Sequence, residues 1–232
     1  VTFSRDLDVY QGQINVNANT TFAGNASIRN DSLIRLNSGT FTTPGTLSVH
    51  SGGRIERTGG AYDVNALYLD NGASLDYKTG DTITTGLALY NGATLTLDRN
   101  LALAGGIDLR NSASLVTGAN NYSASSLYLN GNVNLAYRPG DSIAATGDIN
   151  VHNGSTLTLT RNLDNNLLAL SGGGAISRTT ETIRIGRFGV DGTGTLLTLK
   201  NGDEIYANEA NYVTSGATVT NTGLSAVTGS LR

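Results

Sequence analysis

Short apolar triplets recur along the chain, and a polar turn-forming pair follows most of them. Leu67-Tyr68-Leu69 precedes Asn71-Gly72, and Ile149-Asn150-Val151 precedes Asn153-Gly154. The last apolar residue of each triplet recurs about every 20 residues, with extremes of 19 (9 to 28) and 22 (129 to 151). These anchors are Val9, Ile28, Val49, Leu69, Leu89, Leu109, Leu129, Val151, Leu170 and Val190, with a degenerate copy at Val213.

A second apolar position lies six residues after nearly every anchor. Around it the apolar and polar residues alternate, as in Leu95-Thr96-Leu97, which is the period of a strand with one buried face. Nothing repeats at helical spacing, so each repeat predicts two or three short strands. The second positions are Ile34, Ile55, Leu75, Leu95, Leu115, Leu135, Leu157, Ile176 and Leu196, and third-side residues are Ile83, Leu103 and Ile143.

A 20-residue unit of short strands cannot bury its apolar face alone, so it has to stack on copies of itself. The sequence therefore predicts an all-β parallel β-helix, or β-solenoid, of about 10–11 coils, with equivalent residues about 4.8 Å apart. The rule for parallel crossovers makes the coil right-handed. With no linker or shift in composition, we expect residues 1–232 to be a single β-solenoid domain.

The residue two positions after several anchors is asparagine, at Asn71, Asn91, Asn111 and Asn153. Asparagine tolerates the left-handed backbone of a sharp corner. Because these positions are equivalent, their amides are candidates for a hydrogen-bonded ladder along the stack. The alternative is that each asparagine is simply a good turn former.

A longer period overlies the short one. Similar phrases begin at Lys78, Arg138 and Lys200, 60 and 62 residues apart, and each contains Gly-Asp: Asp81, Asp141 and Asp203. Leu95–Leu101 similarly resembles Leu157–Leu163 at a distance of 62. We interpret three coils, about 61 residues, as the duplicated unit, and the Gly-Asp phrase as a structural turn.

The charges exclude several classes of partner and site. The 15 Lys and Arg against 18 Asp and Glu are scattered and give a net charge of −3, which argues against nucleic acid. No apolar run approaches the ~20 residues of a membrane span. Without cysteine there is no disulfide framework, zinc-thiolate site or thiol nucleophile.

Taken together, the runs Leu87–Leu97 and Ile149–Leu159, repeated on this step in a Gly-rich, cysteine-free chain, resemble the passenger domains of bacterial autotransporters and filamentous-haemagglutinin-type exoproteins. The resemblance covers essentially the whole chain and concerns architecture more than activity. It implies a right-handed β-helix, secretion across a Gram-negative envelope, and a role in adhesion, aggregation or the biofilm matrix.

One outward stripe is the best candidate for binding. Its members are aromatic and basic: Tyr68, Tyr90, Arg110, Tyr128 and His152. Such a stripe is suited to stacking on sugar rings or packing against a neighbouring rod; the alternative is that it only stabilises an exposed sheet.

The acidic residues give little support for catalysis or metal binding. Most occur once per coil at different lateral positions, and Asp81, Asp141 and Asp203 are roughly 14 Å apart if three coils separate them. A calcium site at Asp191, Asp203 and Glu204 is disfavoured by the neighbouring Lys200. We therefore expect no enzyme activity, metal or cofactor.

These observations predict a secreted, bacterial cell-surface adhesive solenoid, and we expect it to be a fragment of a longer protein. Its partners would be further copies of itself, or a host or biofilm surface protein or glycan, with no nucleic acid and no membrane insertion. Two alternatives remain: a self-assembling filament subunit, and a polysaccharide lyase or tailspike-type depolymerase.

Overall fold

The computed structural model describes residues 1–206, 211–223 and 226–227, which contain strands and turns but no helix. No described segment is a helix long and apolar enough to cross a membrane. The chain forms two compact units, residues 1–122 and 123–232. In both, parallel strands stack as coils of a β-solenoid, about 11 turns in all, with equivalent positions about 20 residues apart. The predicted fold class is thereby confirmed, whereas the single domain stays a prediction.

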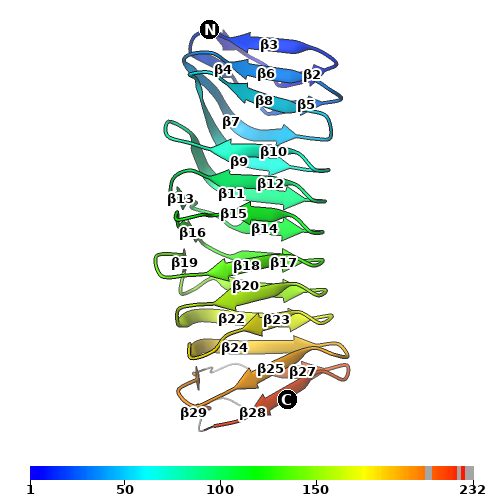
Figure 1. The fold of residues 1–232 in the computed structure, drawn as a ribbon, viewed down its shortest axis with the longest axis vertical. Helices are drawn as coiled ribbons and strands as arrows, with labels where there is room; N and C mark the ends of the chain where they lie inside the picture. Colours follow the sequence, from blue (N-terminus) through cyan, green and yellow to red (C-terminus); the bar gives the residue numbers. More distant parts are fainter. Residues whose placement is uncertain (207–210, 224–225, 228–232) are drawn as a thin grey trace. The chain divides into compact units, whose positions relative to one another are not determined.

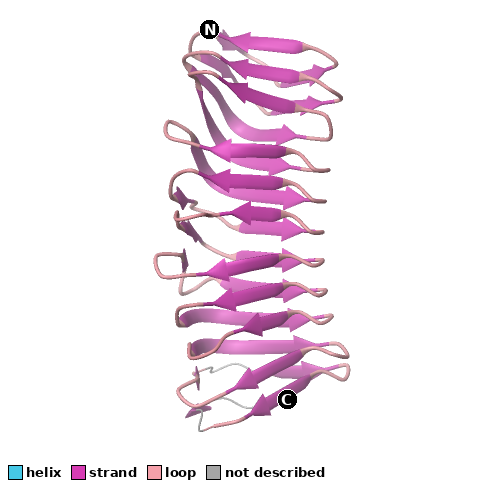
Figure 2. Cartoon of the chain, in the orientation of Figure 1, coloured by secondary structure: helices cyan, strands magenta, loops and turns pink. Residues whose placement is uncertain are grey.

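Figure 1 labels the strands, and Figure 2 shows that short turns and loops connect them. The strands of the first unit are β1 (Thr2–Phe3), β2 (Leu7–Tyr10), β3 (Gln13–Val16), β4 (Thr20–Phe22), β5 (Ala26–Arg29), β6 (Leu33–Leu36), β7 (Thr40–Val49), β8 (Arg54–Arg57), β9 (Ala61–Leu69), β10 (Ser74–Tyr77), β11 (Thr82–Tyr90), β12 (Thr94–Leu97), β13 (Leu101–Ala102), β14 (Ile107–Arg110) and β15 (Ser114–Val116).

The division between the units falls within β16 (Tyr122–Ala124). The second unit contains β17 (Leu127–Asn130), β18 (Asn134–Tyr137), β19 (Ser142–Ile143), β20 (Asp148–His152), β21 (Thr156–Leu159), β22 (Leu163–Ser171), β23 (Ala175–Ser177), β24 (Ile183–Asp191), β25 (Leu196–Leu199), β26 (Glu204–Ile205), β27 (Tyr212–Thr214), β28 (Thr218–Asn221) and β29 (Ala226–Val227).

Most coils contribute to two kinds of sheet, while β13, β16 and β19 form a separate sheet on the third side. A long strand such as β9 or β11 runs through the third side and the anchor side, and the register shifts at the bend between them. A tight turn then leads to a short strand, such as β10 or β12, in a second sheet. In Figure 1 the nearer strands of each unit run leftward and the fainter ones rightward as the coils descend, so the coil is right-handed.

The predicted anchors form continuous inward columns. In the first unit, Val9, Ile28, Val49, Leu69, Leu89 and Leu109 are successive register partners. In the second, Leu129, Val151, Leu170, Val190 and Val213 are partners in the same way. Leu69 and Leu89 are completely buried. Burial of such a side chain contributes about 1.5–3 kcal/mol, so these columns provide much of the driving force for stacking.

One apolar position differs from the prediction. Leu196 is 47% exposed, whereas Leu197 is buried and aligns with Val219 in the second sheet. The turn before β25 is one residue longer than its counterpart before β23, because Leu197 lies seven residues after Val190 while Ile176 lies six after Leu170. The extra residue reverses which leucine points inward, as a slip of one residue in a strand must.

The second sheet is divided into short groups of strands. In the first unit, β3-β6-β8 and β10-β12-β15 form separate three-stranded sheets. In the second, β18-β21-β23 is separate from β25-β28. We call the interruptions between β8 and β10, and between β23 and β25, the two seams. Both strands that follow a seam, β10 and β25, end directly before a Gly-Asp phrase.

Candidate functional site

The side chains predicted to form one stripe lie in two adjacent outward columns. Tyr68 aligns with Ala88, whereas Tyr90 aligns with Arg110. The columns nevertheless meet, because the Tyr68 and Tyr90 rings form an edge-to-face pair with centroids 5.2 Å apart. Arg110 lies over the Tyr90 ring at 4.9 Å. The spacing therefore does bring Tyr68, Tyr90 and Arg110 into contact.

His50 extends this cluster by one coil. Its ring is 5.5 Å from that of Tyr68, and its Nδ1 is 4.0 Å from a carboxylate oxygen of Asp70. We call His50, Tyr68, Tyr90 and Arg110 the aromatic stripe of the first unit. All four are partly exposed, so they hold each other in place while presenting ring edges and polar atoms to solvent.

Two aspartates that the sequence analysis did not single out, Asp108 and Asp70, contact the polar atoms of the stripe. Asp108 accepts two hydrogen bonds from the Arg110 guanidinium, at 2.9 and 2.8 Å, and one from the Tyr90 hydroxyl at 2.7 Å. Burial and this hydrogen bond raise the pKa of Tyr90 to about 12. Burial also raises the pKa of Tyr68, with a further contribution from Asp70. Both phenols are therefore neutral at physiological pH.

The second unit contains a smaller cluster. The rings of Tyr128 and His152 have centroids 5.2 Å apart, and Asn130 donates to the Tyr128 hydroxyl at 3.2 Å. His152 Nδ1 lies 2.5 Å from the hydroxyl oxygen of Ser171 on the next coil. Burial lowers the pKa of His152, which favours its neutral form.

All four predicted turn asparagines have left-handed backbones, with φ between 50° and 52°. Asn111 donates its amide to Asn91 at 2.8 Å, but Asn91 donates to Asp70 at 2.7 Å instead of to Asn71.

The remaining members also bond to neighbouring side chains. Asn71 donates to Asp70, its own neighbour in the sequence. In the second unit Asn153 donates to Asn130 at 2.7 Å. The asparagines therefore form short chains of hydrogen bonds that also use other side chains, and not one uniform ladder.

The Gly-Asp phrases bury their carboxylates. The side chains of Asp81, Asp141 and Asp203 are fully buried. Each accepts a hydrogen bond from the backbone N–H three residues earlier, at 2.7 to 2.8 Å. Asp81 and Asp203 also accept from the backbone N–H groups of Tyr62 and Ile183 on the preceding coil. This geometry makes the phrase a structural turn, as its sequence predicts.

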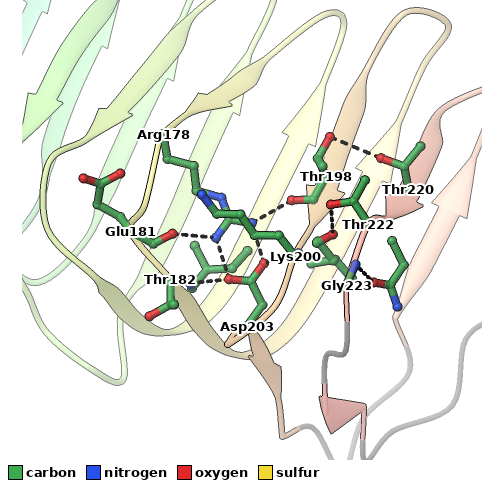
Figure 3. A network of polar contacts seen from close by, with 12 residues as sticks. Arg178, Glu181, Thr182, Thr198, Lys200, Asp203, Thr220, Thr222 and Gly223 are labelled. Carbon is green, nitrogen blue, oxygen red and sulfur yellow. Dashed lines mark hydrogen bonds and ion pairs between the residues drawn. The ribbon is translucent and has the colours of Figure 1, made fainter.

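At each seam an arginine of the preceding coil pairs with the buried aspartate. Arg57, the last residue of β8, pairs with Asp81 through both guanidinium branches. Arg178, directly after β23, pairs likewise with Asp203, and it also donates to the backbone oxygens of Thr198 and Glu181 (Figure 3). Asp141 pairs instead with Arg138 of its own turn, at 3.3 Å. The arginine–aspartate pairs thus connect two coils where the ladder of the second sheet is interrupted.

The second repeated phrase contacts the first. Arg99 and Arg161 lie over the rings of Tyr77 and Tyr137, at 5.5 and 5.2 Å. Arg161 also donates to the backbone oxygen of Asp141 at 2.6 Å. The second phrase thus packs against the first at both places where the pair occurs.

The acidic residues considered for calcium have separate partners. Asp203 faces Arg178, Glu204 pairs with Arg184 at 2.9 Å, and Asp191 accepts from Thr214 at 2.7 Å. Among the described residues there is no group of three or more His, Cys, Asp or Glu that could hold a metal ion.

Sequence reasoning missed Arg57 and Arg178 because each lies a full coil before its aspartate, 24 and 25 residues away. The available signal was an arginine at the last residue of the strand before a seam, or directly after it. Comparison with known proteins found no matching family model, no matching curated protein and no matching solved structure.

Proposed function

We propose that this β-solenoid is an adhesive segment of a secreted bacterial surface or biofilm-matrix protein, and that it acts through repeated lateral contacts between copies. The resemblance of its repeats to autotransporter and haemagglutinin-type passengers gives the biological setting. The observation that carries the proposal is the aromatic stripe, in which His50, Tyr68, Tyr90 and Arg110 make ring contacts across successive coils.

The stripe has properties that suit a lateral contact. Its aromatic side chains are held by their neighbours, so they lose little conformational freedom on binding. Tyrosine and arginine are the residue types that contribute most to the energy of protein interfaces. Because Asp108 neutralises the charge of Arg110, two copies can approach without strong repulsion at this arginine. Several weak contacts on one solenoid would then add through multivalency.

The stripe also argues against sugar stacking at Tyr90. One side of this ring is covered by the Arg110 guanidinium, and the Tyr68 ring packs against it. Its remaining free surface is mainly edge, which favours packing against another protein surface over the face-to-face stacking of a sugar ring.

Sedimentation velocity across a concentration series tests the proposal. We expect the wild-type chain to associate, and Tyr68→Ala/Tyr90→Ala to weaken association about tenfold or more, the usual effect of losing an interface anchor. Tyr212→Ala removes an exposed tyrosine of the second unit and is the matched control. A wild-type chain that stays monomeric, or a double variant that associates like wild type, contradicts the proposal.

Negative-stain microscopy of the same samples separates this role from the filament alternative. Side-by-side pairs that disappear in the double variant support lateral adhesion. End-to-end growth that the double variant retains would instead favour a filament subunit.

A further inference from the structure

A shallow groove of about 530 Å³ lies on the outer face of the first unit, beside the aromatic stripe. Its floor follows one outward column, in which Thr46, Ala66 and Gly86 are register partners on successive coils. Asn25 continues the groove at one end and Gly106 at the other. Asn25 to Gly106 spans four coil steps, or about 19 Å at the spacing of adjacent strands. The groove therefore runs across the strands, along the direction of stacking.

The glycine in the middle of this floor leaves room that a side chain could fill. Gly86 does not have a left-handed backbone, and an added Cβ would be 3.8 Å from its nearest neighbour, the backbone oxygen of Gly106. By contrast, a Cβ at Gly105 would collide with the backbone oxygen of Thr85. Gly86 lies at the bend of β11, where the register shifts after Ile83, and glycine is common at such bends. What the missing side chain does is keep the groove open.

The lining is uncharged and has polar groups available for hydrogen bonds. It contains no Asp, Glu, Lys, Arg or His. The hydroxyls of Thr46 and Ser48 make no hydrogen bond within the part of the chain that the structure describes, and the Tyr68 ring borders the groove. Hydroxyl groups next to an aromatic ring, on an uncharged surface, match a ligand that is rich in hydroxyl groups and has apolar ring faces.

From this geometry we infer that the groove binds a linear, neutral oligosaccharide lying along the stacking direction. Successive sugar units would pass over Thr46, Ala66 and Gly86, with Ser48 and Thr46 donating to or accepting from their hydroxyls. A charged glycan would lose hydration on this surface without gaining a partner of opposite charge. The inference deepens the adhesive role and rests on that role for its biological setting, but it can fail independently of self-association.

The test measures binding of neutral linear oligosaccharides, namely β-1,4-glucan, α-1,4-glucan and β-1,4-mannan hexamers, by isothermal titration calorimetry at millimolar ligand. Gly86→Leu fills the groove, and its matched control is Gly189→Leu in β24, where an added Cβ would meet nothing within 4 Å. We expect wild type and Gly189→Leu to bind at least one hexamer, and Gly86→Leu to lose at least tenfold in affinity. Thermal unfolding verifies that both variants keep wild-type stability; Ala66→Leu replaces Gly86→Leu if the latter is unstable.

The outcomes separate this site from the stripe. Arg110→Ala changes the stripe at a residue outside the groove lining whose ring contact is with Tyr90, so it should keep oligosaccharide binding while it weakens association. Absence of binding to every hexamer, or equal binding by wild type and Gly86→Leu, overturns the inference. Loss of self-association in Gly86→Leu without any oligosaccharide binding also overturns it, because the groove would then be a contact between copies.

Discussion

The two seams contain the same buried arginine–aspartate pair, but the residues around the pair differ. In both, a fully buried aspartate pairs with an arginine of the preceding coil where the second sheet is interrupted. The Arg57 side chain is 11% exposed and lies 5.4 Å from the centroid of the Tyr62 ring. The Arg178 side chain is only 6% exposed and donates to two backbone oxygens in addition to Asp203.

This difference changes the balance of charge at the two aspartates. Burial raises the pKa of Asp81 above its ordinary value of 3.8, despite hydrogen bonds from Lys78, Tyr62 and Arg57. At Asp203, Arg178 and the backbone N–H groups outweigh the effect of burial, so the pKa lies below 3.8. The carboxylate of the Gly-Asp phrase is therefore more strongly favoured in its ionised form at the second seam. The surroundings of a buried ion pair thus decide how much the pair contributes to stability.

Removing the arginine should have the largest effect. Arg178→Ala leaves Asp203 buried and unpaired, and we expect a loss of about 3–5 kcal/mol in the free energy of unfolding. Arg57→Ala should cost less, because Asp81 takes up a proton more readily. Urea unfolding followed by circular dichroism measures both; equal losses would remove the distinction between the seams.

A substitution that makes the first seam resemble the second should have an intermediate effect. Tyr62 and Ile183 occupy equivalent positions, since the backbone N–H of each donates to the buried aspartate. Tyr62→Ile removes the contact with Arg57 and the hydrogen bond to the backbone oxygen of Asp76. We expect it to cost about 1–3 kcal/mol in urea unfolding, from the lost aromatic volume and hydrogen bond. The matched control, Ile183→Val, should cost about 0.5–1.5 kcal/mol.

At acid pH, protonation of the buried aspartate should have opposite effects on the free energy of unfolding at the two seams. Asp203 has a lowered pKa in the folded chain, so its stabilising contribution is complete above pH 3.8 and is lost as the pH falls below that value. Asp81 has a raised pKa, so its protonation above pH 3.8 favours the folded chain. The destabilisation caused by Asp203→Asn should therefore shrink as the pH falls below 3.8. Relative to wild type, Asp81→Asn should become more destabilising as the pH falls from neutral to 3.8. Identical pH profiles for the two variants would refute this.

The smallest effect should come from an exposed ion pair. Arg184 pairs with Asp164 of the preceding coil at 3.3 Å and with Glu204 of the following coil at 2.9 Å, but its side chain is 50% exposed. We expect Arg184→Ala to change urea unfolding least of these variants, because solvent screens an exposed ion pair. A loss as large as that of Arg178→Ala would show that burial is not what separates the seams from the surface pairs.

The sequence predicted the repeating part of the fold well, because one period determines which residues stack. Every anchor from Val9 to Leu109, and from Leu129 to Val213, has the register partner that the 20-residue step predicts within its unit. Leu196 failed because a single extra turn residue is invisible to a pattern that averages over coils. The sequence predicted the members of the stripe but placed them in one column. They occupy two outward columns, two residues apart along the strand.

Contacts between coils were harder to predict. The partner of Asp81 is Arg57, and nothing near Asp81 in the sequence marks it. The position of such a partner depends on the exact length of the intervening coil and on where the second sheet is interrupted. The groove was not predicted either, because an absent side chain at Gly86 gives no pattern until its neighbours are placed.

The seams also bear on how a chain of this kind can change length. Because β8 and β10 share no ladder, the pairing of β7 with β9 alone sets the strand register across the first seam, and the pairing of β22 with β24 does so across the second. A recombination event at these points would exchange complete cassettes, each bounded by an arginine on one side and a Gly-Asp turn on the other. Insertion of such cassettes would keep the arginine–aspartate pair at each seam, while the outward residues of every new coil could diverge.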